Sequence, residues 1–126
     1  MARILVIDDD ASVTRVTREH LTREGHTVIE AYDGSEAIRI LLEIPVDLAI
    51  TDLYMPNMDG IEFTIRLGQL RPETKIIAIS GGGYKGKEEV LQVARNLGVI
   101  RTLEKPFTRD ELLAAVHDTL CVVSGV

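Results

Sequence analysis

The sequence predicts an α/β fold in which helices cover both faces of a doubly wound parallel sheet. Short apolar segments alternate with longer amphipathic segments along the whole chain, and this alternation is typical of parallel strands joined by helices. The chain has 126 residues, a length that fits one domain, and shows no repeat or linker-like tract. We therefore expect a single domain over residues 1–126.

Five strand–helix pairs are predicted in order along the chain. Each strand is a short, mainly apolar run, and each helix carries apolar residues at spacings of three and four, the period of one helix face. The predicted pairs are Arg3–Ile7 with Ala11–Glu24, Thr27–Ala31 with Ser35–Glu43, Val46–Thr51 with Gly60–Leu70, Lys75–Ser80 with Glu88–Leu97, and Val99–Leu103 with Arg109–Leu120.

Apolar spacing and capping residues justify the individual helices. The residues expected to face inward are Val13, Val16 and Leu21 in the first helix, Ile38, Leu41 and Leu42 in the second, and Leu113, Val116 and Leu120 in the last. The predicted capping residues are Asp10 as an N-cap, the pairs Asp33 with Glu36, Asp59 with Glu62 and Thr108 with Glu111 as capping boxes, and Gly25 and Gly98 as helix stops.

Polar residues within two strands predict the strand order. The first, third and fourth strands contain unbroken apolar runs, as expected of strands covered on both faces. The second strand carries Glu30, and the fifth carries Arg101 and Thr102. Such interruptions suit edge strands, so the order should be the flavodoxin-like 2-1-3-4-5. In this fold, ligands bind beyond the carboxyl ends of the strands, at the switch point between the first and third.

Composition narrows the classes of function and the compartment. The formal net charge is −6, which argues against direct binding to nucleic acid, because that binding depends on clustered Lys and Arg. Cys121 is the only cysteine, so no internal disulfide can form and a cytoplasmic, reducing location is expected. The sequence shows neither a signal peptide nor an apolar run that could span a bilayer, so no membrane association is expected.

Polar residues collect where four of the predicted strands end. They are Asp8, Asp9 and Asp10 after the first strand, Asp52 after the third, Ser80 at the end of the fourth and Lys105 after the fifth. Each would be ordinary alone, since Asp10 suits a helix cap and Asp52 a turn. Because parallel strands end at one edge of the sheet, these groups should converge, and their joint placement indicates a functional site.

Crowded carboxylates repel one another, and a hard divalent cation can offset this repulsion. Mg²⁺ prefers oxygen ligands and commonly joins one or two carboxylates to a phosphate, with Mn²⁺ as a possible substitute. A nearby lysine adds positive charge, and a carboxylate can serve as a nucleophile that forms an aspartyl phosphate. Phosphoryl transfer, which depends on positioning and charge stabilisation, fits this set of residues.

The chain resembles response-regulator receiver domains, including the chemotaxis regulators, along nearly its whole length. Four stretches carry the resemblance: Ile4-Leu5-Val6-Ile7-Asp8-Asp9-Asp10, Asp52-Leu53-Tyr54-Met55-Pro56-Asn57-Met58-Asp59-Gly60, Ile79-Ser80-Gly81 and Lys105-Pro106-Phe107. The resemblance implies a signalling module of two-component systems rather than an enzyme. Its phosphodonor would be a sensor histidine kinase or a histidine phosphotransfer protein, and it would control a downstream protein or output domain.

The resemblance also implies a role for each matched residue. Asp52 would accept the phosphoryl group. Asp9 and Asp52 would bind Mg²⁺ directly, Asp8 largely through water, and the backbone carbonyl of Tyr54 would be a further ligand. Ser80 and Lys105 would each contact a phosphoryl oxygen. The Lys105–Pro106 bond would be cis, Phe107 would belong to the core, and slow hydrolysis of the aspartyl phosphate would follow.

One position departs from the family pattern. An aromatic residue usually lies three residues before the lysine and turns inward on phosphorylation, but here the residue is Thr102. This departure affects the conformational switch and leaves the chemistry at Asp52 unchanged. Tyr54 and Gly82 occupy the two positions that tune dephosphorylation in the family, and we hypothesise that Tyr54 shields the acyl phosphate from water.

Two other functions compete with this interpretation. A Mg²⁺-dependent phosphatase of the haloacid-dehalogenase type would use Asp8 as nucleophile, but it leaves the run from Asp52 to Gly60 unexplained. A receiver-like interaction module that needs no phosphorylation is favoured only by Thr102. A flavodoxin proper is disfavoured, because the acidic loop after the first strand would repel a phosphate. The sequence leaves open a monomer or a phosphorylation-dependent dimer.

Overall fold

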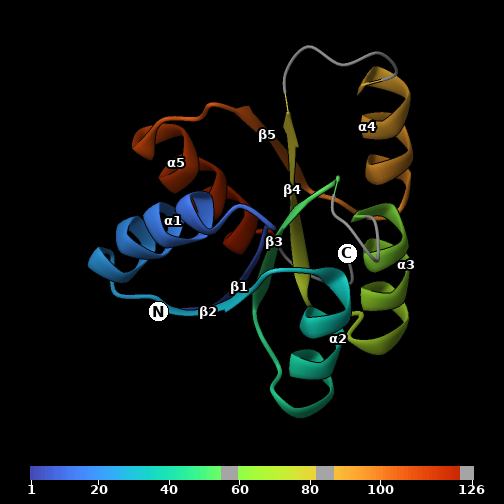
Figure 1. Ribbon diagram of the computed structural model, residues 1–126, viewed down its shortest axis with the longest axis horizontal. Helices are drawn as coiled ribbons and strands as arrows, with labels where there is room; N and C mark the ends of the chain where they lie inside the picture. Colours follow the sequence, from blue (N-terminus) through green and yellow to red (C-terminus); the bar gives the residue numbers. More distant parts are fainter. Residues whose placement is uncertain (55–59, 82–86, 123–126) are drawn as a thin grey trace.

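The computed structural model describes residues 1–54, 60–81 and 87–122, which form alternating strands and helices (Figure 1). The elements are β1 (Arg3–Ile7), α1 (Ala11–Arg23), β2 (Thr27–Ala31), α2 (Gly34–Glu43), β3 (Leu48–Asp52), α3 (Gly60–Leu70), β4 (Lys75–Gly81), α4 (Lys87–Asn96), β5 (Arg101–Lys105) and α5 (Arg109–Leu120). The predicted alternation of strands and helices is therefore confirmed.

The strands form one parallel sheet with the order β2-β1-β3-β4-β5. This is the predicted order, with the two strands that carry polar residues at the edges. Glu30 on β2 pairs in register with Val6, and Thr102 on β5 pairs with Ala78. The topology therefore places β1 beside β3, the pairing on which the predicted site depends.

Two hydrophobic cores lie on opposite faces of the sheet. In Figure 1, α1 and α5 cover one face, whereas α2, α3 and α4 cover the other. Alternate residues of each strand supply the two cores: Leu5 and Ile7 pack with α2, α3 and α4, and Ile4 and Val6 pack with α1 and α5. Phe63 of α3 is the largest of the fully buried side chains. Coverage on both faces explains the unbroken apolar runs of the central strands.

Most of the predicted helix ends are confirmed. Asp10 caps α1, and Thr108 and Glu111 form the complete capping box of α5. Asp33 accepts the Glu36 N–H, but the Glu36 carboxylate accepts the N–H of Tyr32 rather than that of Asp33. Gly25 and Gly98 have φ of 92° and 102°, the left-handed conformation in which helices commonly stop. The predicted box of Asp59 with Glu62 includes a residue outside the described ranges.

The predicted bounds of three strands were wrong, although β4 differs by one residue only, since it ends at Gly81 rather than Ser80. β5 runs over Arg101–Lys105 rather than Val99–Leu103, because the Val99 N–H bonds to the Ala94 carbonyl and completes the end of α4. β3 runs over Leu48–Asp52 rather than Val46–Thr51. Asp52 and Lys105 are thus the last residues of their strands, where backbone pairing holds them, rather than the first residues of loops.

The predicted inner face of α1 was also wrong in part. Thr14, Thr17 and Leu21 are buried, whereas Val13 is half-buried and Val16 is exposed. The Thr14 hydroxyl donates to the Ala11 carbonyl within the helix at 3.0 Å, which satisfies its polar group and permits burial. On α2, Leu41 is buried as predicted, but Leu42 is exposed. Spacing alone could not separate the valine face from the threonine face, since both repeat at three residues.

Gly60 brings the start of α3 against the strand that carries Asp52. A Cβ atom at this position would lie 2.4 Å from the Asp52 carbonyl oxygen and 2.4 Å from the Leu53 Cα. The Gly60 N–H also bonds to the Leu53 carbonyl at 3.1 Å. Only a residue without a side chain allows this approach, so α3 supports the backbone of Asp52 directly.

Candidate functional site

Three carboxylates meet at the carboxyl edge of the sheet, as predicted. Asp8 follows β1 and Asp52 ends β3, and these strands pair in register up to Ile7 and Thr51. Asp8, Asp9 and Asp52 each offer an oxygen within 4.8 Å of the others. Asp8 and Asp52 are buried, whereas Asp9 is exposed. The fold therefore buries two of the three carboxylates, and solvent reaches the cluster at the third, Asp9.

Lys105 bridges the two buried carboxylates. Its Nζ lies 2.8 Å from Asp8 Oδ2 and 2.8 Å from Asp52 Oδ2. The lysine ends β5, whose Lys105 pairs in register with Gly81 of β4, and β4 in turn pairs with β3. The ammonium therefore reaches the cluster from two strands away and neutralises part of its negative charge.

Backbone N–H groups orient the same carboxylates. The Asp10 N–H donates to Asp8 Oδ1 at 2.9 Å, and the Tyr54 N–H donates to Asp52 Oδ1 at 2.8 Å. Asp52 therefore accepts one bond from the Tyr54 N–H and one from Lys105, whereas Asp8 accepts one bond from the Asp10 N–H and forms an ion pair with Lys105. Such charge-assisted bonds fix the direction of a carboxylate more firmly than neutral ones, so the cluster is pre-organised.

Burial dominates the electrostatics of Asp8. It raises the pKa of this carboxyl above the ordinary value, and the nearby Asp52 charge acts in the same direction, against the bonds from Lys105 and Asp10. Burial also opposes the charge of Lys105, but its bonds to Asp52 and Asp8 more than offset this, so the pKa of Lys105 is raised. The site thus holds a charged lysine and a carboxylate whose ionisation the fold disfavours.

Asp10 has the structural role expected of it. Its carboxylate accepts the Ser12 N–H at 2.9 Å and the Ser12 hydroxyl at 2.6 Å. The bonds from Ser12 hold the pKa of Asp10 below its usual range. Asp10 is therefore the N-cap of α1, whereas the two residues before it, Asp8 and Asp9, belong to the acidic cluster.

The other residues predicted for the site differ in how far they are buried. Ser80 is buried on β4, directly after the Ile79 that pairs with Asp52. Tyr54 follows the acidic cluster with an exposed side chain, and Thr102 is half-buried on β5 beside Ala78. Gly82 lies outside the described residues. The strand register thus places Ser80 at the same edge as Asp52.

The chemistry of the acidic cluster fits a hard divalent cation. Carboxylate oxygens are the ligands that Mg²⁺ prefers, and three lie within reach of one another here. A cation would also relieve the repulsion between Asp8 and Asp52. The exposed Asp9 leaves one side of the cluster open, as a metal that retains water requires.

Sequence reasoning missed an apolar hollow beside this cluster. A cavity of about 500 Å³ lies between the start of α1 and the loop after β5, lined by Ser12, Val13, Val16, Thr17, Lys105, Pro106 and Phe107. Phe107 was expected in the core, but it is half-buried and lines this hollow while contacting the core. The only sequence signal was the pair of valines on α1, which was assigned to the core.

Comparisons with known proteins agree with this geometry. The family profile described as "Response regulator receiver domain" matches residues 4–117. The chain belongs to the response-regulator receiver family. A receiver domain of this family is a signalling module of two-component systems rather than a classical enzyme, and its acidic pocket binds Mg²⁺. The prediction of a receiver is thereby confirmed, and the phosphatase alternative finds no support.

Individual relatives cover this receiver domain almost completely. It is 29% identical over 123 residues to sporulation initiation phosphotransferase F of Bacillus subtilis (strain 168), covering 98% of this chain and 97% of that protein. Its fold matches the solved CheY-like receiver domain protein of Methanospirillum hungatei JF-1 with a TM-score of 0.88 at 28% identity, covering 95% and 94% of the two chains.

Other relatives are much longer. The receiver domain is 33% identical over 119 residues to the transcriptional regulatory protein GlrR of Escherichia coli (strain K12). The match covers 94% of this chain but only 26% of GlrR. The chain therefore spans about a quarter of the length of such relatives. The Lys105–Pro106 peptide bond is cis, as the resemblance implied.

Replacing Asp8 should stabilise the metal-free receiver domain at neutral pH. Because the pKa of Asp8 is raised by folding, the native state binds its proton more tightly, and stability falls as pH rises through the folded pKa. Asp8→Asn removes this effect and keeps an oxygen for the Asp10 N–H. We expect a gain on the order of 1 kcal/mol at pH 7 that disappears in acid, measured by urea unfolding with a chelator.

Asp9→Asn is the matched control, because Asp9 is exposed and its neutralisation should change the free energy of unfolding little. Added Mg²⁺ should stabilise the wild-type protein more than either variant. A loss of stability in Asp8→Asn at pH 7 would show that the Lys105 contact outweighs burial.

Proposed function

We propose that Asp52 accepts a phosphoryl group from the phosphohistidine of a sensor histidine kinase or phosphotransfer protein. One observation carries this proposal: Asp52 ends the central strand β3, within 2.8 Å of the Lys105 ammonium and within 4.8 Å of the Asp8 and Asp9 carboxylates. A carboxylate with this surrounding charge can attack phosphorus, because positioned charges offset the negative charge that gathers in the transition state.

The transfer step balances as a simple exchange of bonds. A carboxylate oxygen of Asp52 forms a bond to phosphorus while the N–P bond of the donor breaks and the imidazole leaves with its electron pair. The Tyr54 N–H, 2.8 Å from Oδ1, keeps the carboxylate directed at the open side of the cluster. Lys105 then pairs with an oxygen of the phosphoryl group, and Ser80 donates its hydroxyl to another.

The acidic cluster is the proposed cation site. Asp9, Asp52 and the backbone carbonyl of Tyr54 would hold Mg²⁺ directly, and Asp8 would act largely through water. When bound, Mg²⁺, or Mn²⁺ in its place, supplies positive charge to the phosphoryl oxygens. Asp8 and Asp9 therefore serve to hold the cation, and neither is the nucleophile.

The apolar hollow beside Lys105 is the proposed contact for the phosphodonor protein. Val16 is 46% exposed and lies with Val13 and Phe107 around a cavity that includes Lys105 itself. A donor that delivers its phosphohistidine to Asp52 must cover this side of the site. Apolar side chains of the donor would then fill the hollow and exclude water, which is the usual arrangement at a binding hot spot.

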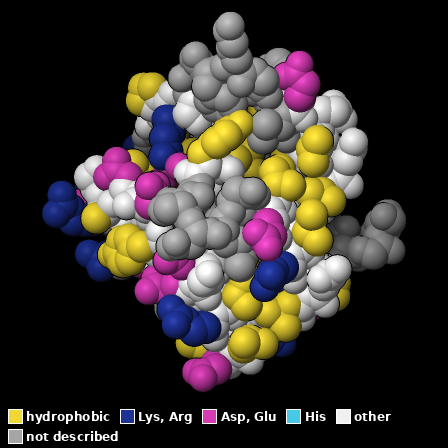
Figure 2. Space-filling view, turned by 45° about the vertical axis from the view of Figure 1, so that its right-hand side comes forward, with side chains coloured by type: hydrophobic (Ala, Val, Ile, Leu, Met, Phe, Trp, Pro, Cys, Tyr) yellow, Lys and Arg dark blue, Asp and Glu magenta, His cyan; other side chains and the backbone are white. Residues whose placement is uncertain are grey.

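Phosphorylation would act on a downstream protein or output domain through the face that carries α4, β5 and α5. Val93 and Leu97, in or just after α4, are exposed, and Figure 2 shows hydrophobic side chains exposed among charged ones where α3 and α4 face the viewer. Thr102 replaces the usual aromatic residue of β5 and borders a hollow of about 410 Å³ with Arg95 and Ile100. The switch would therefore shift populations without the aromatic ring.

Three further proposals concern the extent of the domain, its location in the cell and its oligomeric state. We propose that residues 1–126 form one receiver domain that works in the cytoplasm as a monomer or as a phosphorylation-dependent dimer. In the part of the chain that the structure describes, no helix is long and apolar enough to cross a bilayer. The acidic net charge of −6 disfavours direct contact with nucleic acid.

Asp52→Asn should abolish phosphorylation. With a phosphodonor and Mg²⁺, the wild-type chain should gain about one phosphoryl group, detected by intact mass and mapped to Asp52 by peptide analysis, whereas the variant should gain none. A chelator should also prevent labelling of the wild-type protein. Asp10→Asn is the matched control, because asparagine also caps helices and should leave labelling intact. Labelling of Asp52→Asn would reveal a different acceptor.

Tyr54→Ala should shorten the lifetime of the aspartyl phosphate. If the Tyr54 ring shields the phosphoryl group from water, its removal should speed hydrolysis several-fold, corresponding to on the order of 1 kcal/mol in the barrier. Loss of radioactive label after removal of the donor measures this rate. Tyr32→Ala is the control, since the two rings are similarly exposed, at 43% and 45%. An unchanged half-life in Tyr54→Ala would exclude shielding.

Val16→Asp should slow phosphoryl transfer from a phosphodonor protein but not from a small-molecule donor. A charge in the apolar hollow should lower kcat/KM for transfer from the phosphodonor protein by roughly tenfold and leave labelling by acetyl phosphate unchanged. Leu42→Asp is the control, because Leu42 is also exposed but lies on α2, across the sheet from α1. Equal loss with both donors would mean that the substitution damages the acidic site rather than a docking surface.

A further inference from the structure

Helix α5 is not followed by a glycine that ends it, whereas α1 and α4 are. Gly25 and Gly98 follow α1 and α4 with φ of 92° and 102°, a left-handed conformation that turns the chain out of the helix. The residue directly after α5, Cys121, has φ −81° and ψ −9°, close to the values of Glu24 directly after α1, φ −86° and ψ 4°. The position that Gly25 takes after α1 is occupied after α5 by Val122 rather than by glycine. The backbone at Cys121 does not by itself stop α5.

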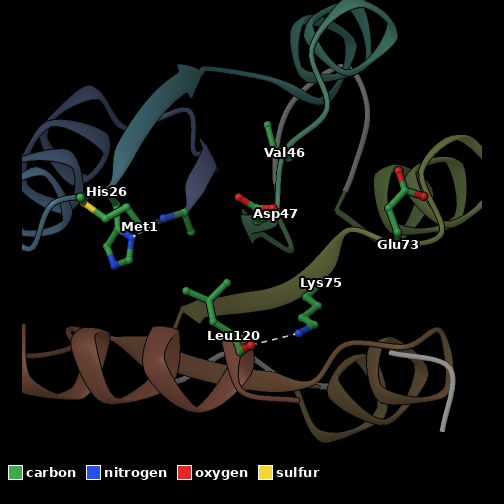
Figure 3. Close-up of a pocket in the computed structure, with 8 residues that line it drawn as sticks. Met1, His26, Val46, Asp47, Glu73, Lys75 and Leu120 are labelled. Atoms are coloured by element: carbon green, nitrogen blue, oxygen red, sulfur yellow. Dashed lines mark hydrogen bonds between the residues drawn. The ribbon is translucent and has the colours of Figure 1, made fainter. Parts of the chain in front are cut away.

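A lysine from the sheet binds the carbonyls at this helix end. Lys75, the first residue of β4, donates from Nζ to the Leu120 carbonyl at 3.1 Å and also to the Val122 carbonyl. Figure 3 shows the Lys75 side chain pointing at the Leu120 carbonyl. Both residues line a cavity of about 510 Å³, together with Met1, His26 and Asp47. This cavity lies at the amino edge of the sheet, opposite the acidic cluster.

These bonds are worth more than an ordinary surface contact. The last carbonyls of a helix have no partner within the helix, and they carry the negative end of its dipole, which favours a cation. Lys75 is half-buried, so water competes less for its ammonium. Leu120 also packs on the core formed with α1 and α5. The end of α5 is thus fixed to β4 by charge and by packing.

We propose that Lys75 is a positioning residue that sets where α5 ends and therefore the direction in which the chain leaves the domain. Each residue that a helix gains or loses turns the following segment by about 100° and shifts it by about 1.5 Å. The chain continues beyond Val122, and the match covers only 26% of the longer relative GlrR. In any protein that continues past this helix, Lys75 would orient the following segment. The proposal does not depend on phosphorylation of Asp52.

Hydrogen exchange of the backbone amides at the end of α5 tests this role. The Cys121 and Val122 N–H groups donate to the His117 and Thr119 carbonyls at 3.1 and 3.2 Å. In the full chain, Lys75→Met keeps the aliphatic stem and removes the donors, and it should speed exchange at these two amides about tenfold. Lys75→Arg restores a charged donor and should keep exchange within about threefold of the wild-type rate.

Arg101→Met is the matched control. Arg101 of β5 also reaches α5, but it contacts the Asp118 carboxylate at 3.0 Å rather than the terminal carbonyls. Its loss should leave the two amides protected. If Lys75→Met does not fold, Lys75→Leu, which also lacks a donor, replaces it with the same expectation. The proposal is overturned if exchange at Cys121 and Val122 stays at the wild-type rate in the Lys75 variant, or rises equally in Arg101→Met.

Discussion

The parallel pairing of β1 with β3 is the constraint on which the rest of the structure depends. It brings Asp8 and Asp52 to one edge at close range, where two buried carboxylates would repel each other. Lys105 offsets that repulsion from β5 with two contacts of 2.8 Å. The sheet, the helices on its two faces and the cap at Asp10 all hold these three groups in place.

The same crowding explains why this edge suits phosphoryl transfer. The two buried carboxylates carry more negative charge than one lysine can neutralise. A hard cation can supply the missing positive charge and can at the same time bind a phosphoryl group. Burial makes the ionisation of Asp8 less favourable, and a bound cation would favour it again. Perturbed pKa values of this kind are common at functional sites.

A lysine side chain binds oxygen atoms at each end of the sheet. At the carboxyl edge, Lys105 contacts the buried carboxylates of Asp8 and Asp52. At the amino edge, Lys75 donates to the Leu120 and Val122 carbonyls at the end of α5. In both places an ammonium at a strand terminus contacts oxygen atoms of other elements, carboxylates in one case and backbone carbonyls in the other.

The amino-acid sequence by itself determined the strand–helix alternation, the edge positions of β2 and β5, and the convergence of Asp8, Asp9, Asp52 and Lys105. Apolar period and the rules for parallel sheets are enough for these. Only the tertiary structure decided that Thr14 and Thr17 rather than Val16 face the core, that β5 begins at Arg101, and that Lys75 ends α5. The inner face of α1 and the end of α5 depend on packing and bonds between distant parts of the chain, and the start of β5 depends on a backbone bond that completes the end of α4. An apolar period of three or four residues reveals none of these contacts.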